Sequence, residues 1–161
     1  MEVFKIFKNK GYTMIEIAVV LAITMAMAAV SVPSLARFSD GVKYKETAVE
    51  IASRLRLGRQ LAIAVNREHI FAIDPANRRY RLLEGNQSTG STEWRVIRDW
   101  AYLPTDVSMA TGASCDNTAS VNYSFNTDGT ASPGAICVKD RYDTAKFTIN
   151  INAISGRVYV N

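Results

Sequence analysis

The chain has 161 residues and a formal net charge of +4, and 48% of its residues are hydrophobic. This length fits one modest domain and a membrane helix, and so mild a charge gives no reason to expect a polyanionic partner. With one histidine and two cysteines, the chain shows no metal-ligand spacing and no nucleophile–base constellation, so we predict no enzyme, cofactor or metal site.

The N-terminal segment places a basic stretch before a long apolar run. Three lysines precede Gly11, whereas residues 17–32 carry only two polar side chains. With residues 12–15 the run approaches the ~20 residues that span a bilayer. Glu16 stands at its head, although an ionised carboxylate in hydrocarbon costs at least about 2.5–3.5 kcal/mol. The pattern predicts a leader, residues 1–11, and a retained transmembrane helix, residues 12–40.

Two other interpretations of this segment are open. A secretory signal peptide has the same order of basic and apolar regions, and an uncleaved single-pass anchor has the same length. Neither accounts for Glu16 at the head of the apolar run. In all three cases the basic residues favour a cytoplasmic N-terminus.

Residues 11–16, GYTMIE, resemble the processing site of type IV pilins and type II secretion pseudopilins. The resemblance implies that a prepilin peptidase cuts between Gly11 and Tyr12 and methylates the new amino terminus at Tyr12. Tyrosine replaces the commoner phenylalanine but keeps an aromatic ring. Glu16 falls on the acidic position of the family, where we expect it to pair with the N-terminal amine of a neighbouring subunit or its own. Pro33 falls on the family's helix-bending proline.

Helical spacing resumes after Asp40 and predicts an amphipathic continuation of the helix. Apolar residues recur in steps of four and three, which marks one face of a helix. Between them Glu50 and Arg54 have the spacing of an i,i+4 ion pair. This face is expected to pack on a sheet, and its members are Tyr44, Ala48, Ile51, Leu55, Gly58, Ala62 and Val65.

After Asn66 the hydrophobic period changes to two, which is typical of strands. The turn cluster at residues 74–77 predicts a hairpin, and the segment 104–120 is predicted to be an irregular loop. We therefore expect an α+β, pilin-like fold: a long N-terminal helix packed on antiparallel β-sheet. His69, Trp94 and Trp100 are interpreted as strand and packing residues. The predicted strands are residues 69–73, 80–83, 94–98, 121–125, 135–138, 146–154 and 157–160.

The two cysteines, Cys115 and Cys137, lie in the distal half of the chain. An exported domain meets oxidising conditions, which favour a disulfide between them. Such a bond would contribute about 3 kcal/mol in the chain-entropy model. Two buried free thiols are the alternative.

The C-terminal half resembles the H-type minor pseudopilins and related minor type IV pilins, the GspH/FimT-like group, in residues 125–130, 136–138 and 149–160. The resemblance implies a low-abundance subunit of a pilus or pseudopilus, at its initiation or tip. Its partners would be the prepilin peptidase, other pilins or pseudopilins and the inner-membrane assembly platform. Residues 41–161 would form the periplasmic domain of a single-pass inner-membrane protein that then enters a filament.

Two alternatives concern the role of the chain in such a filament. Some relatives in this group bind DNA during natural transformation through arginines near a C-terminal glycine. Here Gly156 is followed by one arginine, Arg157, and Tyr159 stands where a second basic residue would strengthen that case. Phosphate binding requires several cations on one surface. The second alternative is that the chain is a major pilin. The abundance of the chain in purified filaments distinguishes a major from a minor subunit.

Overall fold

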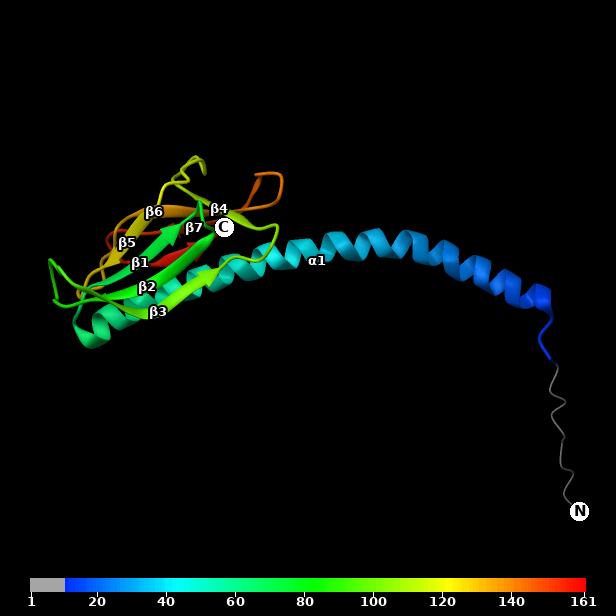
Figure 1. Ribbon diagram of the computed structural model, residues 1–161, viewed down its shortest axis with the longest axis horizontal. Coiled ribbons are helices and arrows are strands. Elements are labelled where there is room, and N and C mark those ends of the chain that lie inside the picture. The colour runs from blue at the N-terminus through cyan, green and yellow to red at the C-terminus, as the bar shows by residue number, and fades with distance from the viewer. Residues whose placement is uncertain (1–10) are drawn as a thin grey trace, which may run out of the picture. The chain divides into compact units, whose positions relative to one another are not determined.

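The computed structural model describes residues 11–161, except that the side chains of residues 30–39 lie outside the description. The chain separates into two compact units, residues 1–40 and 41–161. Figure 1 shows one long helix and the strands that follow it. The strands are β1 (His69–Asp74), β2 (Arg79–Gly85), β3 (Trp94–Tyr102), β4 (Ser108–Thr111), β5 (Val121–Phe125), β6 (Gly134–Lys139), β7 (Ala145–Ile151) and β8 (Val158–Val160).

The helix α1, Met14–Val65, begins and ends at residues suited to those positions. At its start the Thr13 hydroxyl accepts a hydrogen bond from the Glu16 backbone N–H at 3.3 Å, which satisfies a donor left free by the first turn. At its end Asn66 adopts a φ of 53°, a left-handed conformation that asparagine tolerates and that commonly terminates helices. The predicted change from helix to strand therefore begins at Asn66, whose left-handed conformation ends the helix.

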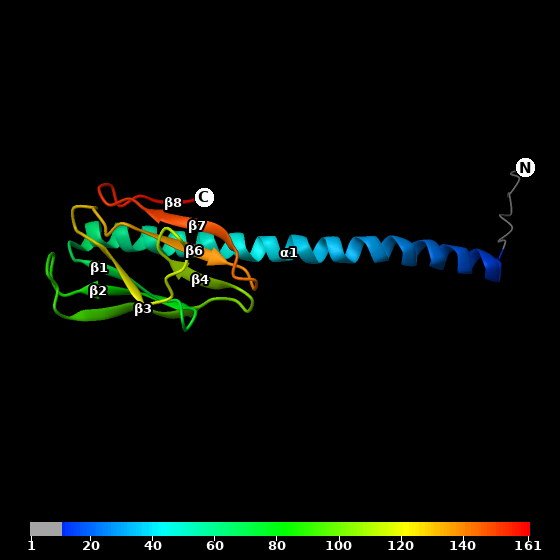
Figure 2. The ribbon, with the colours of Figure 1, turned by 90° about the horizontal axis from the view of Figure 1, so that it is seen from above.

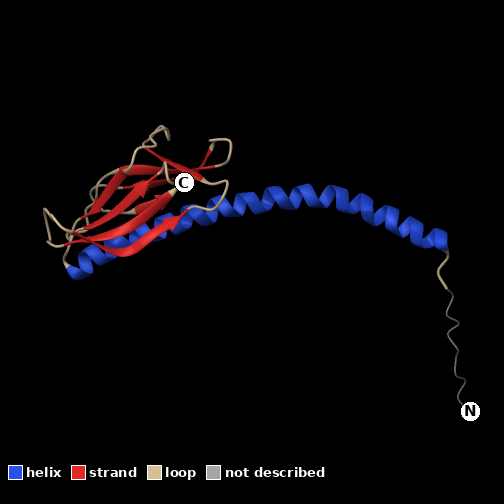
Figure 3. Ribbon diagram, in the orientation of Figure 1, coloured by secondary structure: helices blue, strands red, loops and turns tan. Residues whose placement is uncertain are grey.

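The strands form two four-stranded antiparallel sheets (Figure 3). The first has the order β3-β2-β1-β5 and the second β4-β6-β7-β8. Seen from above, β1, β2 and β3 lie along one side of the C-terminal part of α1, and β7 and β8 lie along the other (Figure 2). The expected α+β fold is confirmed, with two sheets on one helix.

One hydrophobic core joins the helix to both sheets. The predicted helix face is buried at every position from Tyr44 to Ala62, with Ile51 and Leu55 fully buried. Small residues allow a close approach: a Cβ at Gly58 would lie 3.0 Å from Leu82 Cδ1. The prediction is wrong for Val65, which is 48% exposed because it is the last residue of the helix.

All seven predicted strands form in the predicted order, but the described residues contain an eighth strand and one predicted strand is too long. The loop predicted at residues 104–120 contains β4, which pairs with β6 at the edge of the second sheet. Three consecutive β4 residues are buried, so this short strand lacks the alternation that identifies a half-buried strand. The strand predicted at residues 146–154 ends at Ile151, because residues 152–157 form the turn into β8.

Candidate functional site

The predicted cleavage junction lies in exposed, non-helical chain. Gly11, Tyr12 and Thr13 precede the helix and are exposed, with Tyr12 78% exposed. Glu16 lies in the first turn of α1 and is also exposed. The positive end of the helix dipole favours an acidic residue at this position. The Gly11–Tyr12 bond is thus accessible, and the Glu16 carboxylate is open to contact with another chain.

The first part of α1 exposes large apolar side chains. Met14 is 92% exposed, Ile15 74% and Ile23 56%. Among the helical residues whose side chains are described, no stretch has both the length and the hydropathy of a membrane span. Pro33 belongs to residues 30–39, whose side chains lie outside the description, so the bend at Pro33 stays a prediction.

The disulfide between Cys115 and Cys137 is present, with their Cα atoms 5.6 Å apart. This separation is within the normal range for a disulfide. Cys137 is fully buried in β6, whereas Cys115 lies in the segment between β4 and β5 with a φ of 59°. The bond therefore ties an irregular segment to the second sheet.

The structure brings Arg157 together with two arginines that the sequence analysis did not single out. Arg56 and Arg59 come from α1, and Arg157 comes from the turn before β8. The three side chains line one pocket of about 230 Å³, with Gln60, Gly156 and Val158. We refer to these six residues as the arginine pocket. The only signal in the sequence is the i,i+3 spacing of Arg56 and Arg59, which places both on one face of a helix.

Two glycines let the turn between β5 and β6 and the turn before β8 approach the helix beside this pocket. Gly129 and Gly156 have φ values of 86° and 57°, which glycine adopts without steric cost. A Cβ at Gly156 would lie 2.3 Å from Gly129 O and 2.7 Å from Arg59 Nε. Arg59 Nε donates to Gly129 O at 3.1 Å. Gly156 is therefore required by close packing as well as by its backbone conformation.

Three arginines in and directly before β2 have partners within the chain. Arg79 donates to Asp74 at 3.0 Å, and its guanidinium lies 4.3 Å from the ring centroid of Trp100. Arg81 lies over the same ring at 4.4 Å. Arg78 donates to Pro104 O. Arg79 is thus paired with a carboxylate, whereas Arg78 meets a carbonyl oxygen and Arg81 an aromatic ring.

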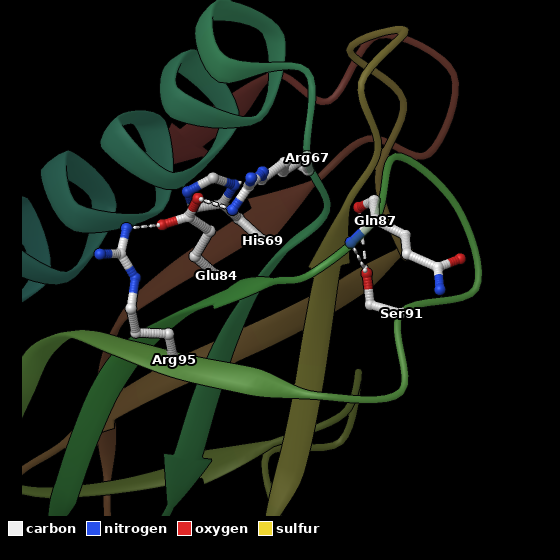
Figure 4. Close-up of polar contacts among 6 residues, drawn as sticks. All are labelled: Arg67, His69, Glu84, Gln87, Ser91 and Arg95. Atoms are coloured by element: carbon white, nitrogen blue, oxygen red, sulfur yellow. Dashed lines mark hydrogen bonds and ion pairs between the residues drawn. The ribbon is translucent and has the colours of Figure 1, made fainter.

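Glu84 is the most buried carboxylate of the first sheet and joins three segments (Figure 4). It accepts from Arg67, which follows α1, and from Arg95 on β3. The Arg95 hydrogen bond in particular lowers the pKa of Glu84, and the positive charge of Arg67 acts in the same direction. Beside it His69 is fully buried, with Nδ1 3.0 Å from Arg67 O. This cluster fastens the end of the helix to the sheet.

No group of three or more histidine, cysteine, aspartate or glutamate side chains able to hold a metal ion occurs in the described part of the chain. The lone histidine belongs to the strand core, as interpreted from the sequence. The predicted ion pair between Glu50 and Arg54 is present at 3.2 Å.

Comparison with known proteins identifies a family and several similar structures. The family model described as "Type II transport protein GspH" matches residues 47–156. The fold is similar to the minor pseudopilin EpsH from the Vibrio cholerae type 2 secretion system, at 15% identity and a TM-score of 0.59 over 73% of this chain and 94% of that chain. A second structure of that protein is similar at 13% identity and a TM-score of 0.59, over 74% of this chain and 95% of that chain.

The solution structure of Escherichia coli GspH is also similar, at 11% identity and a TM-score of 0.56 over 75% of this chain and 89% of that chain. At these identities the likeness shows the fold alone. No curated protein matches the sequence.

Proposed function

Because the chain belongs to the GspH family of type II transport proteins, we propose that it is a minor pseudopilin that enters the type II secretion pseudopilus by its N-terminal helix. One observation in particular supports this proposal. The described start of α1 exposes consecutive large apolar side chains, with a single carboxylate, Glu16, in its first turn. Such a helix requires either lipid or other helices around it.

The proposed maturation accounts for the residues at the start of the helix. A prepilin peptidase cuts between Gly11 and Tyr12, within the exposed residues before α1, and methylates the amine of Tyr12. Residues 1–11 are the leader, and residues 12–40 anchor the chain in the inner membrane before assembly. Residues 41–161 form the periplasmic domain, an orientation favoured by the basic leader.

Pairing of charges supplies the proposed driving force for assembly. A carboxylate buried among apolar helices without a cation is strongly unfavourable. Cleavage creates a cation at Tyr12, and we propose that Glu16 pairs with this amine on a neighbouring subunit. The partners are then other pseudopilins, with the peptidase and the inner-membrane assembly platform acting earlier. In this proposal the chain has a structural role in the pseudopilus and no catalytic role.

Purified pseudopili test this proposal. We expect the chain in pseudopili sheared from cells with an active type II secretion system, at far fewer copies than the major subunit, and we expect its deletion to reduce secretion. Abundance equal to the main subunit would instead identify a major pilin. Absence from the pseudopilus, together with normal secretion by the deletion strain, would refute the proposal.

DNA binding has less support than filament assembly. Arg79 and Arg95 are paired with Asp74 and Glu84. Arg78 and Arg81 contact Pro104 O and the Trp100 ring. The arginine pocket brings three cations together with no carboxylate among its lining residues. Nucleic acid affinity depends on several phosphate contacts along an extended surface.

A further inference from the structure

The arginine pocket contains three cations without an anion. No carboxylate lines it, and no ion pair of Arg56, Arg59 or Arg157 occurs within the described residues. Several other cations of the chain are paired: Arg54 with Glu50, Lys139 with Asp143, and Lys146 with Asp140. Three guanidinium groups around one pocket repel one another. An incoming anion removes that repulsion.

Two of the guanidinium groups are already fixed in position. Arg56 donates from Nε and Nη2 to Val158 O, at 3.2 and 3.0 Å, and Arg59 donates from Nε to Gly129 O. These bonds leave the Nη1 groups of both side chains free to donate, together with Arg59 Nη2. A ligand therefore meets donors whose conformational entropy has largely been lost on folding. The close packing at Gly156 keeps this geometry.

Size and charge define the ligand. A pocket of about 230 Å³ accepts a single side chain rather than a polymer. Guanidinium groups bind carboxylates through paired, charge-assisted hydrogen bonds. A polyanion would need further cations beside the pocket, and no basic side chain other than these three arginines lines it. The chemistry that fits is one carboxylate presented by a folded protein.

We propose that the arginine pocket receives an aspartate or glutamate side chain of a neighbouring pseudopilin subunit in the assembled pseudopilus. This inference rests on the proposed function, because it requires the chain to lie beside other subunits. The proposed contact is made by the periplasmic domain, and it is additional to the proposed contact between Glu16 and the Tyr12 amine in the N-terminal helix. The contact selects a partner by its charge, since an apolar or basic side chain in this pocket would leave the cations unpaired.

Replacement of Arg157 by lysine allows a direct test. Arg157→Lys keeps the positive charge and supplies an amine, which a water-soluble carbodiimide couples only to a carboxylate in contact with it. Arginine does not react in this way, so the wild-type chain is the background. In pseudopili purified from cells carrying Arg157→Lys, we expect a new amide between residue 157 and an acidic residue of another pseudopilin, identified by peptide mass spectrometry.

A matched control uses an exposed arginine outside the pocket. Arg98 on β3 is exposed, and Arg98→Lys is expected to give no such product. We expect Arg157→Glu to reduce recovery of the chain in pseudopili about tenfold, because like charges then meet at the contact, whereas Arg98→Glu has little effect. An unchanged melting temperature of Arg157→Glu in the full chain shows that the loss is not one of folding.

The outcomes separate this inference from the proposed function. If wild-type chain is present in pseudopili and Arg157→Lys forms no new product, or Arg157→Glu assembles normally, the pocket does not bind a neighbouring carboxylate. A gel shift of DNA by the full chain at low salt, abolished by Arg157→Glu, would assign the pocket to nucleic acid and overturn the inference. If wild-type chain is absent from pseudopili, the proposed function itself fails.

Discussion

At the residue scale, Glu84 and Gly156 show how single positions hold the helix to the two sheets. Glu84 joins the segment after α1 to β3 through Arg67 and Arg95. Gly156 lets the turn before β8 approach Gly129 and Arg59. The Glu84 contacts are electrostatic and the Gly156 contact is steric. Loss of charge therefore weakens the first, and an added side-chain atom disrupts the second.

Glu84→Gln is expected to lower the free energy of unfolding by about 1–2 kcal/mol at pH 7, because two charge-assisted hydrogen bonds lose their anion. The value is modest since both arginines are exposed to solvent, which weakens the ion pairs. The pKa of Glu84 is lowered on folding from an ordinary value of 4.5. Its contribution is therefore present above about pH 4.5 and is lost as the pH falls through the folded pKa.

Urea unfolding of the full chain between pH 3 and 7, compared with Glu93→Gln as a matched control on an exposed residue, measures this effect. A difference between wild type and Glu84→Gln that stays constant down to the lowest pH would contradict it.

Gly156→Ala is expected to destabilise the chain by about 2 kcal/mol or more, from the strained backbone and the clash together. Gly90→Ala is the control, since Gly90 also has a positive φ, 68°, but a Cβ there meets nothing within 4 Å. It should cost only about 1 kcal/mol. Equal losses for the two variants in thermal unfolding would show that packing at Gly156 carries no energy.

At the scale of elements, sequence patterns predicted those parts of the fold whose burial is periodic. The helix face from Tyr44 to Ala62 repeats with the helical period, and most strands alternate or lie between turn residues. The strand β4 was missed because its burial is continuous over three residues. The arginine pocket was missed for another reason: Arg56 and Arg157 are 101 positions apart in the sequence, and only the packing of the second sheet on α1 brings them together.

The disulfide is the covalent link between two elements, and its loss has a defined cost. Cys115 and Cys137 are separated by 22 positions, for which the chain-entropy model gives about 3 kcal/mol. A reducing agent should lower the melting temperature of the wild-type chain and leave that of the Cys115→Ala/Cys137→Ala variant unchanged. A wild-type melting temperature that does not respond to complete reduction would contradict this contribution.

At the scale of the whole molecule, the two parts of the chain present different surfaces to a neighbouring subunit. The first part of α1 offers an exposed apolar surface with one carboxylate, and the α+β unit offers a pocket with three cations. We propose that opposite charges from neighbouring subunits complete both features. Assembly is therefore expected to depend on charge at both positions.

Glu16→Leu tests the charge in the helix. The variant should still be cut and should enter the membrane at least as well, because leucine is more favourable in lipid than glutamate. Its recovery in pseudopili should fall about tenfold or more, since the pairing with the Tyr12 amine is lost. Glu16→Asp is the control that keeps the charge and should retain part of the assembly. Normal incorporation of Glu16→Leu would remove Glu16 from the mechanism.

The N-terminal peptide of the chain isolated from pseudopili tests the central claim most directly, because the pairing needs a free amine next to Glu16. Mass spectrometry should find that this peptide begins at Tyr12 and carries one methyl group on its amine. A chain that retains residues 1–11, or that begins at any position other than Tyr12, would contradict the account.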